Sequence, residues 1–170
     1  NNRTDPAITP LTNITSHDVR WDFLLNDSID DTRPDAMLDT QNNALATTIV
    51  SVDVPVKINA VWVDEGSSHF TSTTDGRATY IGEKGITLPI TVVISILATG
   101  GDKQVTGYIA INGSVIAGSA IQTTSSGTKA GNVTCIWQQL LSPNDYIEVF
   151  IENNSTTDNL TAVHAVTRIN

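Results

Sequence analysis

The sequence predicts an all-β protein, an antiparallel β-sandwich or jelly roll preceded by an irregular N-terminal arm. Every second residue over 86–97 is a large aliphatic residue, which is the period of a strand with one continuous apolar face. The apolar face of this stretch consists of Ile86, Leu88, Ile90, Val92, Ile94 and Ile96. Further β-branched runs recur at intervals of about 8–12 residues between turn residues, as in sandwiches. No stretch has helical periodicity.

Length and charge narrow the class of protein. A chain of 170 residues fits one domain with an arm. Its 18 acidic and 9 basic residues give a net charge of −9. This charge repels phosphate backbones and anionic lipids, so we expect no nucleic-acid partner and no membrane partner. The single cysteine, Cys135, cannot form an internal disulfide, and its place in an alternating strand predicts a buried structural thiol.

Residues 1–43 are predicted to be an acidic, irregular docking arm, and residues 44–170 the jelly-roll domain. The arm contains eight aspartates and three prolines and has no sustained periodicity. Its exception is a short alternation of Val19, Trp21 and Phe23, which we interpret as an anchor on the body or on another protein. Because the chain begins at Asn1 without a methionine, we expect a processed product or a piece of a longer chain.

The acidic run from Asp27 to Asp35 raises the question of a calcium loop. No register places oxygen ligands at positions 1, 3 and 5 with glycine at 6 and glutamate at 12, as an EF-hand requires. The three histidines, His17, His69 and His164, are not spaced as a ligand pair with each other or with the cysteine. We therefore expect no metal site and no cofactor.

The first strands of the predicted domain are two β-branched runs, Ile49–Val54 and Val56–Val63, separated by Pro55. Proline removes a ladder donor, so it marks an edge or a bend. The turn signal Asp75-Gly76 leads into a further strand at Arg77–Ile81.

Asn112-Gly113 predicts a two-residue hairpin turn between strands at Val105–Ile111 and Val115–Ile121, because both turn positions require positive φ. A loop rich in serine and threonine follows at Thr123–Gly131. Leu160–Ile169 is the last predicted strand.

Residues 131–153 are predicted to form a hairpin around a turn at Ser142–Asp145. Ile147, Val149 and Ile151 form the apolar face of its second arm. Large aromatic groups lie on the other face, and a sheet with one wet face does not expose them. A second sheet, a neighbouring subunit or one of each should therefore cover the two faces. If a subunit does, we expect its interface to include Tyr108, Trp137, Tyr146 and Phe150.

The chain lacks the motifs of common enzymes: the Gly-x-Ser-x-Gly elbow, the phosphate loop and the dinucleotide fingerprint. Two carboxylate pairs, Asp64-Glu65 and Glu148/Glu152, would be the acids of a glycosidase if the chain were a hydrolase. Asp64-Glu65 is better explained as part of a turn at the end of a strand. Glu148 and Glu152 are better explained as two residues on one face of a strand. We expect a protein that is not an enzyme.

A family resemblance covers about the last hundred residues. Four segments, in their order along the chain, resemble those of the trimeric jelly rolls of the complement globular head and tumour-necrosis-factor group. The resemblance is to the version of this domain found in tailed-bacteriophage fibre and virion surface proteins. The four segments are Phe70 with Thr73–Gly82, Leu88–Ile96, Tyr108–Ser114 and Leu140–Val149. Asn144 stands where the family has glycine before the aspartate, and both residue types accept left-handed φ. The resemblance implies a homotrimer.

These observations lead to a non-enzymatic bacteriophage virion surface protein, a homotrimeric knob whose arm docks on other virion proteins. Two positions on the particle stay open, a capsid decoration or head fibre and a tail-fibre tip. Loops such as Ser67–Thr74 and Thr123–Gly131 would bind a host-surface glycan. The alternative is a secreted carbohydrate-binding or adhesin module of a larger bacterial protein, and a hydrolase is the third hypothesis.

Overall fold

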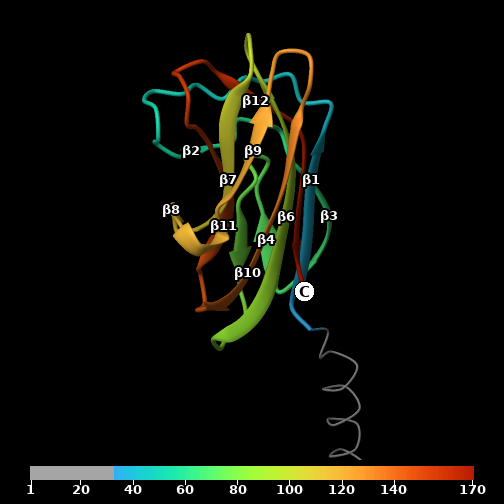
Figure 1. The fold of residues 1–170 in the computed structure, drawn as a ribbon. Helices are drawn as coiled ribbons and strands as arrows, with labels where there is room; N and C mark the ends of the chain where they lie inside the picture. Colours follow the sequence, from blue (N-terminus) through green and yellow to red (C-terminus); the bar gives the residue numbers. More distant parts are fainter. Residues whose placement is uncertain (1–32) are drawn as a thin grey trace, which may run out of the picture. The chain divides into compact units, whose positions relative to one another are not determined.

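The computed structural model describes residues 33–170, which form two antiparallel β-sheets packed face to face (Figure 1). Sheet A has the order β10 (Gly131–Leu141), β6 (Ile86–Ala98), β12 (Leu160–Ile169), β1 (Asp35–Gln41) and β3 (Val63–Ser68). Sheet B has the order β4 (Phe70–Ser72), β5 (Ala78–Tyr80), β11 (Tyr146–Asn153), β7 (Lys103–Ile111) and β8 (Ser114–Val115). Two further strands extend sheet B, β2 (Val56–Lys57) beside β11 and β9 (Ile121–Ser125) beside β7. This arrangement confirms the predicted all-β jelly roll.

The stretch at residues 86–97, with an aliphatic residue at every second position, becomes β6, the strand with the most extensive burial in sheet A. It pairs with β10 along one edge and with β12 along the other. Its inward side chains are all 0% exposed: Leu88, Ile90, Val92, Ile94 and Ile96. Sheet B closes over them because that apolar face has to leave water.

The two sheets approach each other closely at Gly107 of β7. A Cβ atom at this position would lie 2.7 Å from Cγ2 of Val133 and 3.0 Å from Cδ1 of Ile94, both in sheet A. Glycine is the residue that allows this close backbone approach.

The predicted hairpin over residues 131–153 is wrong. β10 pairs with β6 in sheet A, and β11 pairs with β7 in sheet B. The turn at Ser142–Asp145 exists, with the amide of Asp145 donating to the carbonyl of Ser142 (3.0 Å), but it carries the chain from one sheet to the other. A tight turn and two alternating arms do not distinguish a hairpin from a crossing between layers, since both need the same residue types.

The predicted boundary of the arm at residue 43 also needs correction. Residues 35–41 form β1, which lies between β12 and β3 and buries Ala36 and Leu38 at 2% and 1% exposure. Only these two apolar side chains face inward, too few to show as a period among the neighbouring aspartates. Residues 1–32 of the arm, including Val19, Trp21 and Phe23, lie outside the described residues.

Two further strand predictions are partly wrong. Ile49–Val54 forms no strand, and the run from residue 56 to 63 is a strand only at Val56–Lys57, with β3 beginning at Val63. Val50 is 80% exposed, so the β-branched residues of the first run do not share a buried face. Tertiary context decides β-propensity here.

The Asn112-Gly113 turn is confirmed. Both residues have positive φ, 53° and 77°, and the turn joins β7 to β8. The returning strand is interrupted by a short 3-10 helix at Ala117–Ser119 before it resumes pairing with β7 as β9. No helix among residues 33–170 is long and apolar enough to span a membrane.

Cys135 is predicted to be unreactive in the folded chain. Its side chain is 0% exposed, and burial raises the pKa of its thiol to about 11, although a hydrogen bond with the Ile121 backbone opposes this. At pH 8 the rise from the ordinary value of 9.0 lowers the thiolate fraction about 100-fold. Alkylation by iodoacetamide, followed by mass spectrometry, should be at least about 100-fold slower than for the same chain in guanidinium. Equal rates would contradict the burial of this strand.

Candidate functional site

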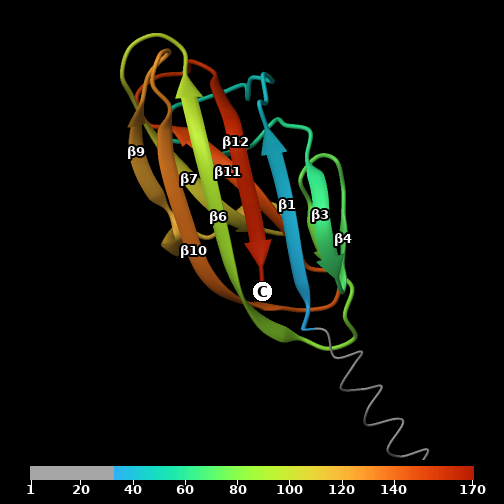
Figure 2. The same cartoon turned by 90° about the vertical axis from the view of Figure 1, so that its right-hand side faces the viewer.

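The outward face of sheet A exposes large apolar side chains. Figure 2 shows its strands side by side, from β10 to β3. Four residues on these strands are exposed to an unusual degree: Val63 at 52%, Val93 at 36%, Ile136 at 65% and Leu140 at 60%. We call this surface the sheet A face. Apolar residues gathered on one sheet face mark an interaction surface more often than scattered ones do.

Strand register aligns these residues in rows across the sheet. One row runs from Val63 through Asp39, Val166 and Val93 to Thr134. A second row, Met37, Arg168, Thr91 and Ile136, lies beside it. The exposed apolar residues of the face thus alternate with polar ones such as Asp39 and Arg168, and the two most exposed, Ile136 and Leu140, lie on β10.

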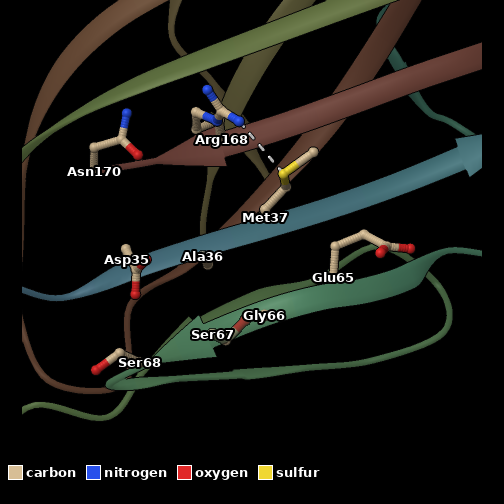
Figure 3. Close-up of a pocket in the computed structure, with 9 residues that line it drawn as sticks. All are labelled: Asp35, Ala36, Met37, Glu65, Gly66, Ser67, Ser68, Arg168 and Asn170. Carbon is tan, nitrogen blue, oxygen red and sulfur yellow. Dashed lines mark hydrogen bonds between the residues drawn. The ribbon is translucent and has the colours of Figure 1, made fainter.

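A groove of about 420 Å³ opens at the other margin of the sheet A face, and we call it the β1–β3 groove (Figure 3). The pairing of β1 with β3 shifts register between Met37 and Leu38. Gly66 stands opposite Met37 with φ of 142°, and a Cβ at Gly66 would meet nothing within 4 Å. The bulge and the missing side chain together leave the space.

Charged side chains of both signs line the β1–β3 groove. Arg168 enters from β12 and lies 3.6 Å from the sulfur of Met37, while Asp35 and Glu65 come from β1 and β3 (Figure 3). Within residues 33–170, no ion pair joins Arg168 to either carboxylate. The groove is polar and open, and it differs in chemistry from the apolar part of the sheet A face.

The outward face of sheet B contains a buried carboxylate between two cations. Glu148 is 3% exposed, and its Oε1 lies 2.8 Å from Nζ of Lys57 and 3.3 Å from Nη2 of Arg77. Lys57 also contacts Oδ2 of Asp75 at 2.7 Å. Burying a carboxylate is costly unless cations and hydrogen bonds compensate, and this cluster supplies both. We call it the Glu148 cluster.

Neighbouring groups hold the Glu148 cluster in place. The hydrogen bond from Lys57, followed by that from the hydroxyl of Thr73, lowers the pKa of Asp75 to about 2. The guanidinium of Arg77 lies 4.1 Å from the centroid of the Tyr146 ring, a cation–π contact. The cluster thus joins β2, the turn before β5, and β11.

Glu152 lies further along β11 in a second polar network. It is 5% exposed and accepts a hydrogen bond of 2.6 Å from the hydroxyl of Tyr108 and one from the amide of Asn154. Burial, the hydrogen bond to Glu152 and its negative charge together raise the pKa of Tyr108 well above its usual range. Glu148 and Glu152 are both buried and already bonded, which is how structural carboxylates behave rather than acids open to a substrate.

Asp64, from the other carboxylate pair, organises a turn. It accepts hydrogen bonds from the amide of Gly66 (2.9 Å) and the hydroxyls of Ser67 (2.8 Å) and Ser72 (2.5 Å). Partial desolvation raises the pKa of Asp64, but these three bonds outweigh it and the net shift is downward.

The four aromatic residues predicted at an interface do not lie on one surface. Tyr108 and Phe150 are cross-strand neighbours on the outward side of sheet B, and Tyr146 lies on the same strand as Phe150. Trp137 belongs to sheet A, where its indole stacks so close to Gly118 that a Cβ there would be 2.6 Å from Cζ3. All four are half-buried. The shared surface assumed a hairpin that the fold does not contain.

The sequence analysis missed the sheet A face. The signal was present, because Ile136 and Leu140 have the opposite parity to the buried Val133 and Cys135. The predicted hairpin puts β10 and β11 in one sheet, so it does not separate the outward residues of β10 from those of β11. The ion pairs of Glu148 with Lys57 and Arg77 had no sequence signal, since these residues are far apart along the chain.

The sequence matches no protein-family model and no curated protein. The fold is similar to the solved structure of PRD1 vertex protein P5, with a TM-score of 0.51 and 11% identity over 80% of this chain and 94% of that chain. Eiger TNF from S. frugiperda matches with a TM-score of 0.49 and 14% identity over 81% of this chain and 92% of its own. Murine APRIL matches with a TM-score of 0.49 and 7% identity, covering 79% and 98% of the two chains. At 11% identity, the similarity to the vertex protein shows a shared jelly-roll fold.

Replacing Glu148 with alanine should lower the free energy of unfolding by about 2 kcal/mol, because Lys57 and Arg77 lose their buried counter-charge. The effect is smaller than the ~3–5 kcal/mol of fully buried pairs, since both cations can regain water. Urea unfolding at one protein concentration measures it. As a control, Asp158→Ala removes an exposed carboxylate that pairs with Lys103 (3.1 Å) and should change little. Equal effects of the two substitutions would contradict the role of the Glu148 cluster.

Proposed function

We propose that this chain is a non-enzymatic bacteriophage virion surface protein whose jelly-roll domain assembles into a homotrimer. The observation that carries the proposal is the sheet A face, which exposes Val63, Val93, Ile136 and Leu140. The fold shared with PRD1 vertex protein P5 supports placement on a virion. A monomer that left this face in water would be prone to aggregate, so a second copy is its natural cover.

The sheet A face is asymmetric, and this favours a ring. Its β10 side is apolar, with Ile136 and Leu140, whereas its β1 side has the charged β1–β3 groove. A two-fold pairing needs a patch that is complementary to itself, while a head-to-tail pairing joins two different patches and forms a ring, such as a cyclic trimer, when its rotation closes. The proposed trimer thus places the β10 side of one copy against the β1 side of the next.

The three half-buried aromatic residues on sheet B are a weaker choice of interface. The hydroxyl of Tyr108 bonds Glu152, and the ring of Tyr146 is covered by Arg77. Phe150 lies between Tyr108 and Lys57 in the register of sheet B. Tyr108 and Tyr146 thus each have a side-chain partner within their own chain, and neither requires a second copy.

The N-terminal arm is proposed to attach the trimer to another virion protein through Val19, Trp21 and Phe23, the alternating apolar residues of its sequence. A capsid decoration or head fibre and a tail-fibre tip both use such an attachment. The outer loops of the domain are then proposed to contact a host-surface glycan.

The second candidate function is a secreted carbohydrate-binding or adhesin module. The polar loops of the domain favour it, and the assembly state separates the two candidates. A module of this kind could remain a monomer, whereas the proposed virion protein is a trimer.

Light scattering should give the purified chain a mass of about 55 kDa, three times 18.2 kDa. Ile136→Asp combined with Leu140→Asp should reduce it to about 18.2 kDa, because charge on the sheet A face opposes burial. Val50→Asp is the control: Val50 is 80% exposed but lies in no strand, so the trimer should persist. A monomeric wild type would refute the trimer and move the binding module to first place.

Trp21→Ala combined with Phe23→Ala should leave the mass of the trimer unchanged and abolish its incorporation into particles. Immunoblotting of purified particles measures incorporation against the wild-type chain. Normal incorporation of the double variant would mean that the arm is not anchored through these two aromatic residues.

A further inference from the structure

A small polar pocket lies between two loops of the domain, and we call it the loop pocket. It has a volume of about 180 Å³ and is lined by Asp102, Thr124, Ser125, Ser126 and Lys129. Asp102 belongs to the turn between β6 and β7, and the other residues belong to β9 and the loop that follows it. This is the loop that the sequence analysis proposed for glycan contact.

The loop pocket is at the end of the sandwich opposite to the start of β1. Register places Ala36, near that start, beside Ile169, which pairs with Ile90 in the first half of β6. The turn between β6 and β7 follows Ala98, at the other end of β6 (Figure 2). The first described strand, β1, therefore begins at the end of the sandwich away from the pocket.

Backbone contacts fix the two loops against each other. The amide of Gly127 donates to the carbonyl of Gly100 (2.8 Å), and the amide of Ser126 donates to the carbonyl of Lys129 (2.9 Å). A Cβ at Gly127 would approach the backbone oxygen of Gly100 to 3.2 Å, so the crossing favours glycine. In β9, just before this loop, the buried hydroxyl of Ser125 donates to the carbonyl of Ile96 (2.6 Å). The backbone on both sides of the pocket is thus held in place without a ligand.

The functional groups in the loop pocket suit a ligand with several hydroxyls. Asp102 supplies an acceptor and Lys129 a donor, while the hydroxyls of Thr124 and Ser126 do both. Among the described residues, neither Asp102 nor Lys129 has a side-chain hydrogen bond or ion pair. One charge of each sign gives no preference for a net anion or cation. The volume is below the ~300–1,000 Å³ of pockets for drug-sized ligands, which suits one ring.

We propose that the loop pocket binds one pyranose unit of a host-surface polysaccharide. Asp102 accepts hydrogen bonds from neighbouring ring hydroxyls, and Lys129 donates to a hydroxyl or ring oxygen. No aromatic side chain lines the pocket, so a single site is weak. The inference rests on the proposed trimer, in which cyclic symmetry directs three such pockets the same way and multivalent attachment strengthens binding.

The test uses the full-length chain with two sets of probes. An array of bacterial surface polysaccharides measures multivalent binding. Saturation-transfer NMR with the methyl glycosides of glucose, galactose, mannose and N-acetylglucosamine measures the single site. We expect the wild type to bind at least one glycoside and a polysaccharide that contains the same sugar.

Asp102→Asn combined with Lys129→Met should reduce both signals at least tenfold. The matched control is Glu83→Gln combined with Lys84→Met, which removes the same two charges from exposed residues between β5 and β6. The control should stay within twofold of the wild type. Thr124→Trp fills the pocket without changing its charge and should also abolish binding.

The proposal is overturned if no glycoside binds the wild type, if the pocket variants keep their binding, or if the control loses it equally. Light scattering on every variant separates this result from the proposed assembly. If the wild type is a trimer but binds no sugar, the proposed function of the loop pocket is refuted and the proposed virion role is unaffected. A monomer that binds sugar through Asp102 supports the pocket and refutes the trimer.

Discussion

The burial of one face of β6 is the constraint on which the rest of the structure depends. Its five inward side chains from Leu88 to Ile96 leave water completely, a transfer worth on the order of 10 kcal/mol. Sheet B has to cover them, and Gly107 lets its backbone approach closely enough. The strand's period of two then directs every other residue outward, so that Val93 appears on the sheet A face. The core and the proposed interface are therefore opposite sides of the same strand.

The connection between β10 and β11 separates two chemically different surfaces. Hydrogen bonds tie this connection to two other segments: the side-chain amide of Asn112 donates to Asp145 (2.7 Å), and the amide of Asn144 donates to the carbonyl of Tyr80 (2.8 Å). Because the chain changes sheets here, the outward residues of β10 join the sheet A face, and those of β11 form the polar face of sheet B. A hairpin would have placed the two sets side by side.

These two surfaces differ in how many of their outward side chains have a partner within the same chain. On sheet B, Glu148 and Glu152 have cations and hydrogen-bond donors from neighbouring segments, so this face is stable in water as it stands. On sheet A, Ile136 and Leu140 have no such compensation. The balance favours assembly through sheet A. In the proposed assembly through sheet A, the loops at the end of the sandwich stay open, so the loop pocket remains accessible to a ligand.

The sequence by itself determined the fold class, the central strand and the Asn112-Gly113 turn, because each depends on local rules. Alternation defines the faces of a strand, and a two-residue turn requires positive φ. Cys135 and the inward face of β11 followed from the same period. The layer to which each strand belongs was decided only by tertiary structure, since β10 and β11 have the pattern of a hairpin yet lie in different sheets. The same holds for β1, whose two inward residues show no period, and for the Glu148 cluster, which joins residues 91 positions apart. Contacts of this kind form because the core brings distant segments together, and no local pattern records them.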